Sequence, residues 1–235
     1  MSYIIILFII IIAIILLKIV INVRIKEIKN IANNKKLDEI TNKFPENIEI
    51  CKKILNITKN KNVKIEENKD NKSSFYFIAT NTINIANIRD SFTRVQTIAH
   101  ECIHANQDKK LLWFNYIFSN IYLIYFLVIC IAKIFRIIDN NMIYLVILLI
   151  LNTIWIFVRE FLETDAMTKA RYLSEKYIKL ENEENKIIEK EDIEEIMQAY
   201  DNLNNKGIKL ANYQLFLSGM VKIIIYLIIS IIVYI

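Results

Sequence analysis

Four long apolar segments constrain the fold of this 235-residue chain more than any other feature of its sequence. They span residues 3–22, 116–132, 142–158 and 215–235. Each is long enough for an α-helix to cross the roughly 30 Å hydrocarbon core of a bilayer. The chain also contains only two Gly and one Pro, the residues that most often end helices and form turns. The sequence therefore predicts a mainly α, integral membrane protein with about four transmembrane helices. For each segment the alternative is a buried core helix, and it has more weight for the two middle segments, which are short and carry Asn120 and Asn152.

Lysine and arginine residues flank the first apolar segment unevenly. Residues 1–17 contain none, whereas residues 24–36 contain five. Because cytoplasmic loops are enriched in these residues, we expect the N-terminus outside and the chain from residue 23 onward in the cytoplasm. The first segment has no basic start and no small-residue cleavage site, so it predicts an uncleaved anchor over residues 1–22. The expected location is the cell membrane, as a multi-pass protein.

Four spans divide the expected protein into alternating membrane and cytoplasmic parts. We expect a cytoplasmic part over 23–115, a transmembrane hairpin over 116–158, a second cytoplasmic part over 159–214 and a last span over 215–235. The loop at 133–141 then lies outside.

The polar segments predict a small α+β part. The expected elements are a juxtamembrane helix or linker over 23–43, a helix over 46–60, a strand over 62–66, a β-ribbon over 75–79 and 82–86, and helices over 159–180 and 191–203. Asp90 or Ser91 is the expected cap of a further helix after the ribbon, and Gly207 the expected terminator of the last polar helix.

Both histidines of the chain fall in one run, His100-Glu101-Cys102-Ile103-His104. On a helix, residues four apart share a face, so both imidazoles can bind one metal ion. A glutamate between them acts as general base on metal-bound water in zinc hydrolases of this HExxH pattern. The alternative is a pair of histidines on a helix surface. Cys102 points away from the expected metal, and no CxxC pair indicates a disulfide or a cysteine zinc site.

Two histidines leave a catalytic zinc site incomplete, because such sites commonly have three protein ligands, for example two His and one Glu. The third ligand must lie on the same side of the membrane, and two spans separate the motif from Glu160, Glu163 and Asp165. We expect Glu163, since Ala166 one turn later allows its helix to approach closely. Glu160 remains the alternative, and Asp165 is expected to hydrogen-bond a ligand imidazole.

The chain resembles a family of bacterial membrane proteins, the neutral zinc metallopeptidases of the gluzincin type. The resemblance rests on the N-terminal anchor, the stretch NIEICKKILNITKNKNVKIEEN, the run TIAHECIHANQ, the run ETDA followed by Lys169-Ala170, and the closing apolar helix. It implies a zincin-like cytoplasmic domain with one zinc ion (Zn²⁺) per chain, bound by His100, His104 and Glu163, and Glu101 as the general base. The chain departs from the family at Ile103, where Gly is usual, and at Met167, where a small residue is usual.

These features predict an enzyme, a membrane-anchored zinc endopeptidase that cleaves membrane-associated protein or peptide substrates at the cytoplasmic membrane face. The ribbon offers an edge for an extended substrate, or is an ordinary structural hairpin. Oxyanion stabilisation needs a further donor, and Arg94, Arg171, Tyr172 and Tyr200 are candidates, each with a structural role as its alternative.

The charge pattern narrows the partners. The net charge of +5 comes from lysines scattered through polar segments, with no basic stripe interleaved with aromatic residues. We therefore expect no nucleic-acid partner and a lipid bilayer as the neighbouring surface. The alternative function is a non-catalytic membrane scaffold or assembly protein with a structural or vestigial metal site.

Overall fold

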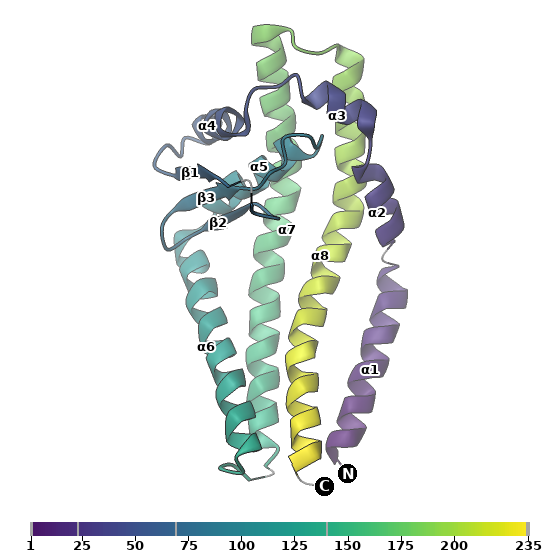
Figure 1. Cartoon of the computed structure of the whole chain (residues 1–235), viewed down its shortest axis with the longest axis vertical. Helices are drawn as coiled ribbons and strands as arrows, with labels where there is room; N and C mark the ends of the chain where they lie inside the picture. The colour runs from purple at the N-terminus through teal and green to yellow at the C-terminus, as the bar shows by residue number, and fades with distance from the viewer. Residues whose placement is uncertain (1, 23, 69, 140, 234–235) are drawn as a thin grey trace. The chain divides into compact units, whose positions relative to one another are not determined.

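The computed structural model describes residues 2–22, 24–68, 70–139 and 141–233. The expected segment ends at residues 1, 23, 234 and 235, and residue 140 of the expected outer loop, lie outside the described residues. The helices are α1 (Ser2–Ile21), α2 (Ile25–Ala32), α3 (Lys35–Thr41), α4 (Asn47–Ile57), α5 (Arg94–Asn106), α6 (Lys109–Ile134), α7 (Ile143–Asn185) and α8 (Lys190–Val233) (Figure 1). The strands are β1 (Lys64–Glu67), β2 (Phe75–Phe77) and β3 (Thr82–Ile85). The prediction of a mainly helical chain with a small sheet is confirmed.

Four of the described helices, α1, α6, α7 and α8, are long and apolar enough to cross a membrane, as predicted. The polar helices expected over 159–180 and 191–203 are not separate, because α7 and α8 run unbroken for 43 and 44 residues. Gly207 therefore does not end a helix, and that prediction was wrong. A Cβ at this position would lie 3.1 Å from Cε of Met167, so the glycine instead permits close packing of α8 against α7.

The chain divides into two compact units. The hydrophobic unit comprises Met1–Val23, Trp113–Phe161 and Lys209–Ile235, and the polar unit comprises Arg24–Leu112 and Leu162–Ile208. Each unit has its own cluster of buried apolar side chains. Because both clusters draw on α7 and α8, these two helices contribute a segment to each unit.

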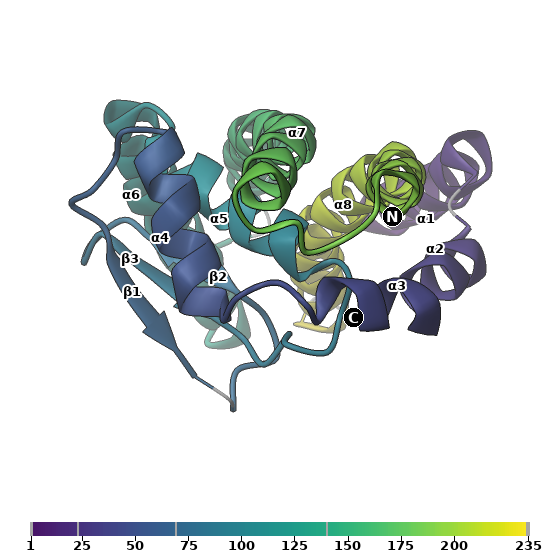
Figure 2. The ribbon, with the colours of Figure 1, turned by 90° about the horizontal axis from the view of Figure 1, so that it is seen from above.

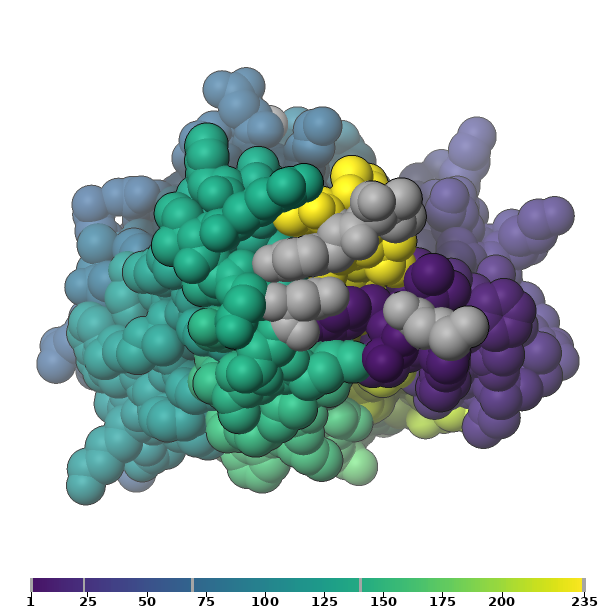
Figure 3. Space-filling view, turned by 90° about the horizontal axis from the view of Figure 1, so that it is seen from below, coloured from purple at the N-terminus to yellow at the C-terminus, as the bar shows by residue number. Residues whose placement is uncertain are grey.

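The hydrophobic unit is a bundle whose outer surface is apolar. The start of α1, the chain between α6 and α7, and the end of α8 gather on one of its faces (Figure 3). Only 6% of the most apolar stretch of α1 is buried, an exposure that suits a lipid environment. Inside, Asn152 is 1% exposed and its side-chain oxygen accepts a hydrogen bond of 2.8 Å from the Tyr122 hydroxyl. The polar residue that made this segment ambiguous is thus satisfied by a neighbouring helix.

The polar unit contains the three-stranded sheet in the order β1-β3-β2. Strand β2 pairs antiparallel with β3, which confirms the ribbon, and Asn81 at the turn has a positive φ of 50°. Strand β1 runs parallel to β3. Helices α4 and α5 contact each other and the sheet (Figure 2). Because β3 is central, Ile83 and Ile85 are fully buried, whereas β1 and β2 form the two edges.

Helix α5 starts later than the sequence predicts. Its N-cap residue is Thr93, not Asp90 or Ser91, and Thr93 makes no capping hydrogen bond through its side chain. Phe92 is fully buried and its N–H donates to the Asp38 carboxylate at 2.8 Å, which holds this stretch in a turn before the helix begins.

Candidate metal centre

Helix α5 holds both histidines on one side because its apolar residues occupy the other. Val95, Ile98 and Cys102, spaced three and four apart, are fully buried in the core of the polar unit. His100 and His104 project from the other side of the helix, where their side chains remain 20% and 12% exposed. The periodicity that buries α5 therefore also aims its two imidazoles in a common direction.

The structure brings the two imidazoles together with Glu163 of α7. The Nε2 atoms of His100 and His104 are 3.0 Å apart. Oε2 of Glu163 lies 3.4 Å from Nε2 of His100 and 3.6 Å from Nε2 of His104. These three residues are thus the ones that the sequence predicts as ligands, and all three belong to the polar unit.

The dimensions of this cluster suit a small tetrahedral ion. Zinc bonds nitrogen and oxygen at about 2.1 Å, so two ligands of a tetrahedral zinc are about 3.4 Å apart. The three distances of 3.0, 3.4 and 3.6 Å surround that value. Two neutral imidazoles and one carboxylate are also a known catalytic donor set for zinc. The residues present therefore fit the ion that the motif implies.

Gln107 determines which ring nitrogen of His104 carries the proton. The Gln107 amide donates through Nε2 to the Leu162 carbonyl at 2.8 Å and to Oδ2 of Asp165 at 3.0 Å, so its oxygen must face the other way. That oxygen lies 2.8 Å from Nδ1 of His104. Since an amide oxygen only accepts, the imidazole proton sits on Nδ1 and the lone pair of Nε2 points toward His100 and Glu163.

Asp165 takes part in the site one step further out than the sequence predicts. Its carboxylate contacts Gln107 and Lys169, not an imidazole, so the expected direct bond to a ligand was wrong. Asp165 does not contact His104 directly because the Gln107 side chain lies between them and hydrogen-bonds to both. Although partial burial opposes it, hydrogen bonds from Gln107 and Lys169 hold the pKa of Asp165 below its ordinary value.

Glu160, the alternative third ligand, is turned elsewhere. Its Oε1 accepts a hydrogen bond of 3.0 Å from Nδ2 of Asn212, and both residues belong to the hydrophobic unit. Among the described residues, the ligand cluster includes Glu163 and not Glu160.

Glu101 lies beside the cluster and is almost completely buried from solvent. Its side chain is 6% exposed, and burial raises its pKa above the ordinary value. The neighbouring imidazoles oppose this rise, as does a hydrogen bond from the backbone of Tyr76 in β2. A glutamate whose pKa is raised by burial is a better proton acceptor than one in water, which suits a general base.

The pKa of His104 is also shifted by its surroundings. Burial disfavours its protonated form, but contacts with Glu163, the nearby charge of Glu101 and the hydrogen bond with Gln107 together raise the pKa of His104 above its ordinary value.

Comparison of the chain with protein-family models, curated proteins and solved structures gives no match. The geometry of the chain itself therefore carries the functional argument.

Three of the four predicted oxyanion donors are held by structural contacts. Arg94 is fully buried and donates to the backbone carbonyls of residues 44–45. The Tyr200 hydroxyl donates to a backbone carbonyl in the core, and Arg171 is paired with acidic groups of α7 and α8. Tyr172 is 66% exposed and lies against Arg171. These contacts favour the structural alternative for Arg94, Arg171 and Tyr200.

A cavity of about 320 Å³ adjoins the cluster on the side of His100 and Glu163. Its walls include Gln96, one turn before His100, and Asn204 of α8. Neither residue was singled out from the sequence. Gln96 could have been found from the sequence, because it lies four positions before His100 and so shares its face of the helix. Nothing in the sequence links Asn204 to residues about a hundred positions earlier.

Proposed function

We propose that this chain is a membrane-embedded, zinc-dependent endopeptidase of the gluzincin type, with a zincin-like catalytic part in the cytoplasm. The observation that carries the proposal is the convergence of His100, His104 and Glu163 from two helices, with Glu101 buried beside them. A fortuitous histidine pair on a helix surface would need neither the carboxylate from α7 nor the fixed tautomer of His104.

In this proposal His100, His104 and Glu163 would hold the zinc ion. When bound, zinc supplies an acidic water and polarises the scissile carbonyl. Glu101 accepts a proton from the attacking water and passes it to the departing amine, so that the peptide bond is hydrolysed with no net change in the enzyme. The burial of Glu101 supports this role, since it keeps the carboxylate close to a site with little competing solvent.

Gln107 and Asp165 orient the ligands in this account. The Asp165 carboxylate holds the Gln107 amide, and the amide oxygen holds Nδ1–H of His104. Groups that hydrogen-bond a ligand imidazole fix its tautomer and raise its basicity.

The free edge of β2 supports extended binding of the substrate. Because the sheet order is β1-β3-β2, one side of β2 pairs with no strand among the described residues, and the Tyr76 backbone hydrogen-bonds to Glu101. A substrate that adds to this edge as a further strand would bring its backbone past the proposed general base.

The position of Glu163 in the chain supports a site whose ligands all lie on the same side of the membrane. Two candidate spans, α6 and the apolar first half of α7, separate the HExxH helix from Glu163. An even number of crossings returns the chain to the side it left, so both parts of the polar unit would share the cytoplasm with membrane-associated substrates.

The test is cleavage of a complex peptide mixture by the zinc-reconstituted, detergent-purified full chain, followed by mass spectrometry of the products. We expect new termini with wild type, and a loss of roughly a thousandfold or more with Glu101→Gln, because general-base catalysis and the water's orientation both depend on that carboxylate. Glu160→Gln is the matched control and should cleave like wild type. Equal cleavage by Glu101→Gln and wild type, or none by either, would contradict the proposal and favour a non-catalytic scaffold.

A further inference from the structure

The cavity beside the proposed zinc site lies within the polar unit, between α5, α7 and α8. Its volume of about 320 Å³ is at the lower end of the range for ligand pockets. His100 and Glu163 form one end of it, so a group that enters the cavity is adjacent to the proposed site of hydrolysis.

The inner wall of the cavity is apolar. Met167 and Ala170 of α7 and Leu203 of α8 line it. Ala170 is 1% exposed and part of the core of the polar unit, so packing fixes its position in the cavity wall. Met167 and Leu203 are only partly buried and contribute to the lining. Such a wall gains free energy when it removes an apolar group from water.

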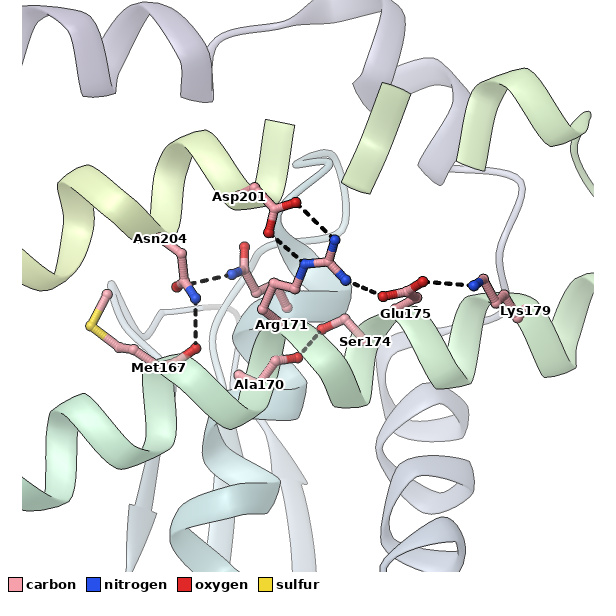
Figure 4. Close-up of polar contacts among 9 residues, drawn as sticks. Met167, Ala170, Arg171, Ser174, Glu175, Lys179, Asp201 and Asn204 are labelled. Carbon is pink, nitrogen blue, oxygen red and sulfur yellow. Dashed lines mark hydrogen bonds and ion pairs between the residues drawn. The ribbon is translucent and has the colours of Figure 1, made fainter. Parts of the chain in front are cut away.

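Thr97 and two amides, Gln96 and Asn204, complete the wall, and the amides are already hydrogen-bonded. Nδ2 of Asn204 donates to the Met167 carbonyl at 2.9 Å, and Oδ1 of Asn204 accepts from Nε2 of Gln96 at 3.3 Å. Figure 4 shows Asn204 reaching from α8 to the backbone of α7 beside the Met167 side chain. These bonds hold the amides in place and join α5, α7 and α8 around the cavity.

No free charge faces the cavity. Among the described residues that line it, His100 and Glu163 alone are ionisable, and both are proposed ligands. Two cations, Lys169 and Arg171, flank the lining residue Ala170 in sequence, and both are paired. Lys169 contacts the Asp165 carboxylate at 2.6 Å. The Arg171 guanidinium contacts the Asp201 carboxylate at 2.6 and 2.8 Å and also pairs with Glu175 (Figure 4). An acidic or basic substrate side chain would therefore enter without a counter-charge, which is costly.

We infer that this cavity is the specificity pocket of the enzyme and takes one bulky, uncharged apolar side chain of the substrate, of the size of leucine or phenylalanine, next to the scissile bond. The inference rests on the proposed function, since it needs the adjacent zinc site. Met167 and Leu203 are the residues that set the size of the accepted side chain.

The test uses probes that need no knowledge of the natural substrate. Hydroxamates bind active-site zinc, so acetohydroxamate measures the metal alone, and the N-acetyl hydroxamates of leucine, phenylalanine, aspartate and lysine add one side chain each. Binding to the zinc-reconstituted full chain is measured by calorimetry. We expect the leucine and phenylalanine probes to bind at least about 10-fold more tightly than the aspartate and lysine probes, as for an apolar pocket that cannot pair a charge.

Two variants test the walls. Leu203→Phe fills the cavity and should weaken the phenylalanine probe about 10-fold while it leaves acetohydroxamate unchanged. Met167→Ala enlarges the cavity and should improve the phenylalanine probe relative to the leucine probe, which keeps the inference testable if Leu203→Phe does not fold. Leu180→Phe is the matched control, because Leu180 is exposed on α7 and does not line the cavity.

The outcomes separate the two proposals. If acetohydroxamate and all four side-chain probes fail to bind in the presence of zinc, the proposed function is overturned. If acetohydroxamate binds but the four side chains are not distinguished, or if both wall variants behave like Leu180→Phe, the pocket inference is overturned and the zinc site stands.

Discussion

At the residue scale, Gln107 has the most specific role outside the proposed ligands. It is the C-cap of α5, so its backbone leaves the helix with φ −64° and ψ 163° and its amide can turn toward α7. We predict that Gln107→Ala lowers zinc affinity by about 10–100-fold, the usual effect of removing a partner of a ligand imidazole. Competition with a chelator of known affinity measures this. Gln198→Ala, an exposed glutamine of α8, is the control, and equal zinc affinity in both variants would contradict the role of Gln107.

The residues that were predictable from sequence are those whose partners are local. His100, Glu101 and His104 form one helical pattern, and the structure keeps them on one helix. Glu163 was selected from three acidic residues by its spacing to Ala166, and the structure buries Ala166 fully in the core of the polar unit. Asp165 was expected to contact an imidazole directly, but it contacts Gln107 instead. The position of Gln107 depends on where α5 ends, which the sequence does not show.

At the element scale, the two glycines of α8 make a matched pair. A Cβ at Gly219 would overlap the side-chain amide of Asn152, which is buried and hydrogen-bonded to Tyr122. A Cβ at Gly207 would meet only the flexible end of Met167, at 3.1 Å. We predict that Gly219→Ala destabilises the chain by about 1–3 kcal/mol through overpacking, whereas Gly207→Ala is close to neutral because the gain in helix propensity of roughly 0.5–1 kcal/mol offsets a small shift of Met167.

Thermal unfolding in detergent, followed by intrinsic fluorescence, measures both variants. A larger loss of stability in Gly207→Ala than in Gly219→Ala would contradict this account of how α8 packs.

The ion pairs between α7 and α8 predict a pH dependence. Arg171 holds the pKa of Asp201 below its ordinary value, mainly by a hydrogen bond. A carboxyl whose pKa is lower in the folded state stabilises the fold above its unfolded pKa, near 3.9, and this contribution disappears as the pH falls through the lower folded value. We therefore predict that Asp201→Asn lowers the melting temperature at pH 7 and that the difference from wild type shrinks below about pH 4.

Lys179→Gln is the control for this pair, since Lys179 contacts Glu175 on the exposed side of the same network. A difference between Asp201→Asn and wild type that stays constant from pH 7 to pH 3 would show that Asp201 acts by packing and not by charge.

Element existence was easier to predict than element length. The four apolar helices and the ribbon follow from composition and alternation, and both are present. The unbroken lengths of α7 and α8 were missed because polar and apolar halves look like separate helices in sequence. No proline interrupts either of them, and Gly207 takes part in helix packing, so the hydrogen-bonded backbone continues through both halves.

At the scale of the whole molecule, the proposal requires both parts of the polar unit to lie on one side of the membrane. The three native cysteines are buried, so single engineered cysteines give a clean signal with a membrane-impermeant maleimide. We predict that Ser73→Cys and Glu183→Cys are protected in intact cells and react after permeabilisation, whereas Asp139→Cys reacts in both. All three positions are exposed. Opposite behaviour of Ser73→Cys and Glu183→Cys would separate Glu163 from the histidines by a membrane and exclude the site.

If His100, His104 and Glu163 bind one zinc ion, the metal content of the purified chain depends on each of these residues. Elemental mass spectrometry is applied to the detergent-purified full chain and to His104→Ala, Glu163→Ala and Glu160→Ala, each reconstituted with zinc and then desalted. We predict one zinc per chain in wild type and Glu160→Ala, and little in His104→Ala and Glu163→Ala. Zinc that is absent from wild type, or that remains in Glu163→Ala and is lost in Glu160→Ala, would contradict this prediction.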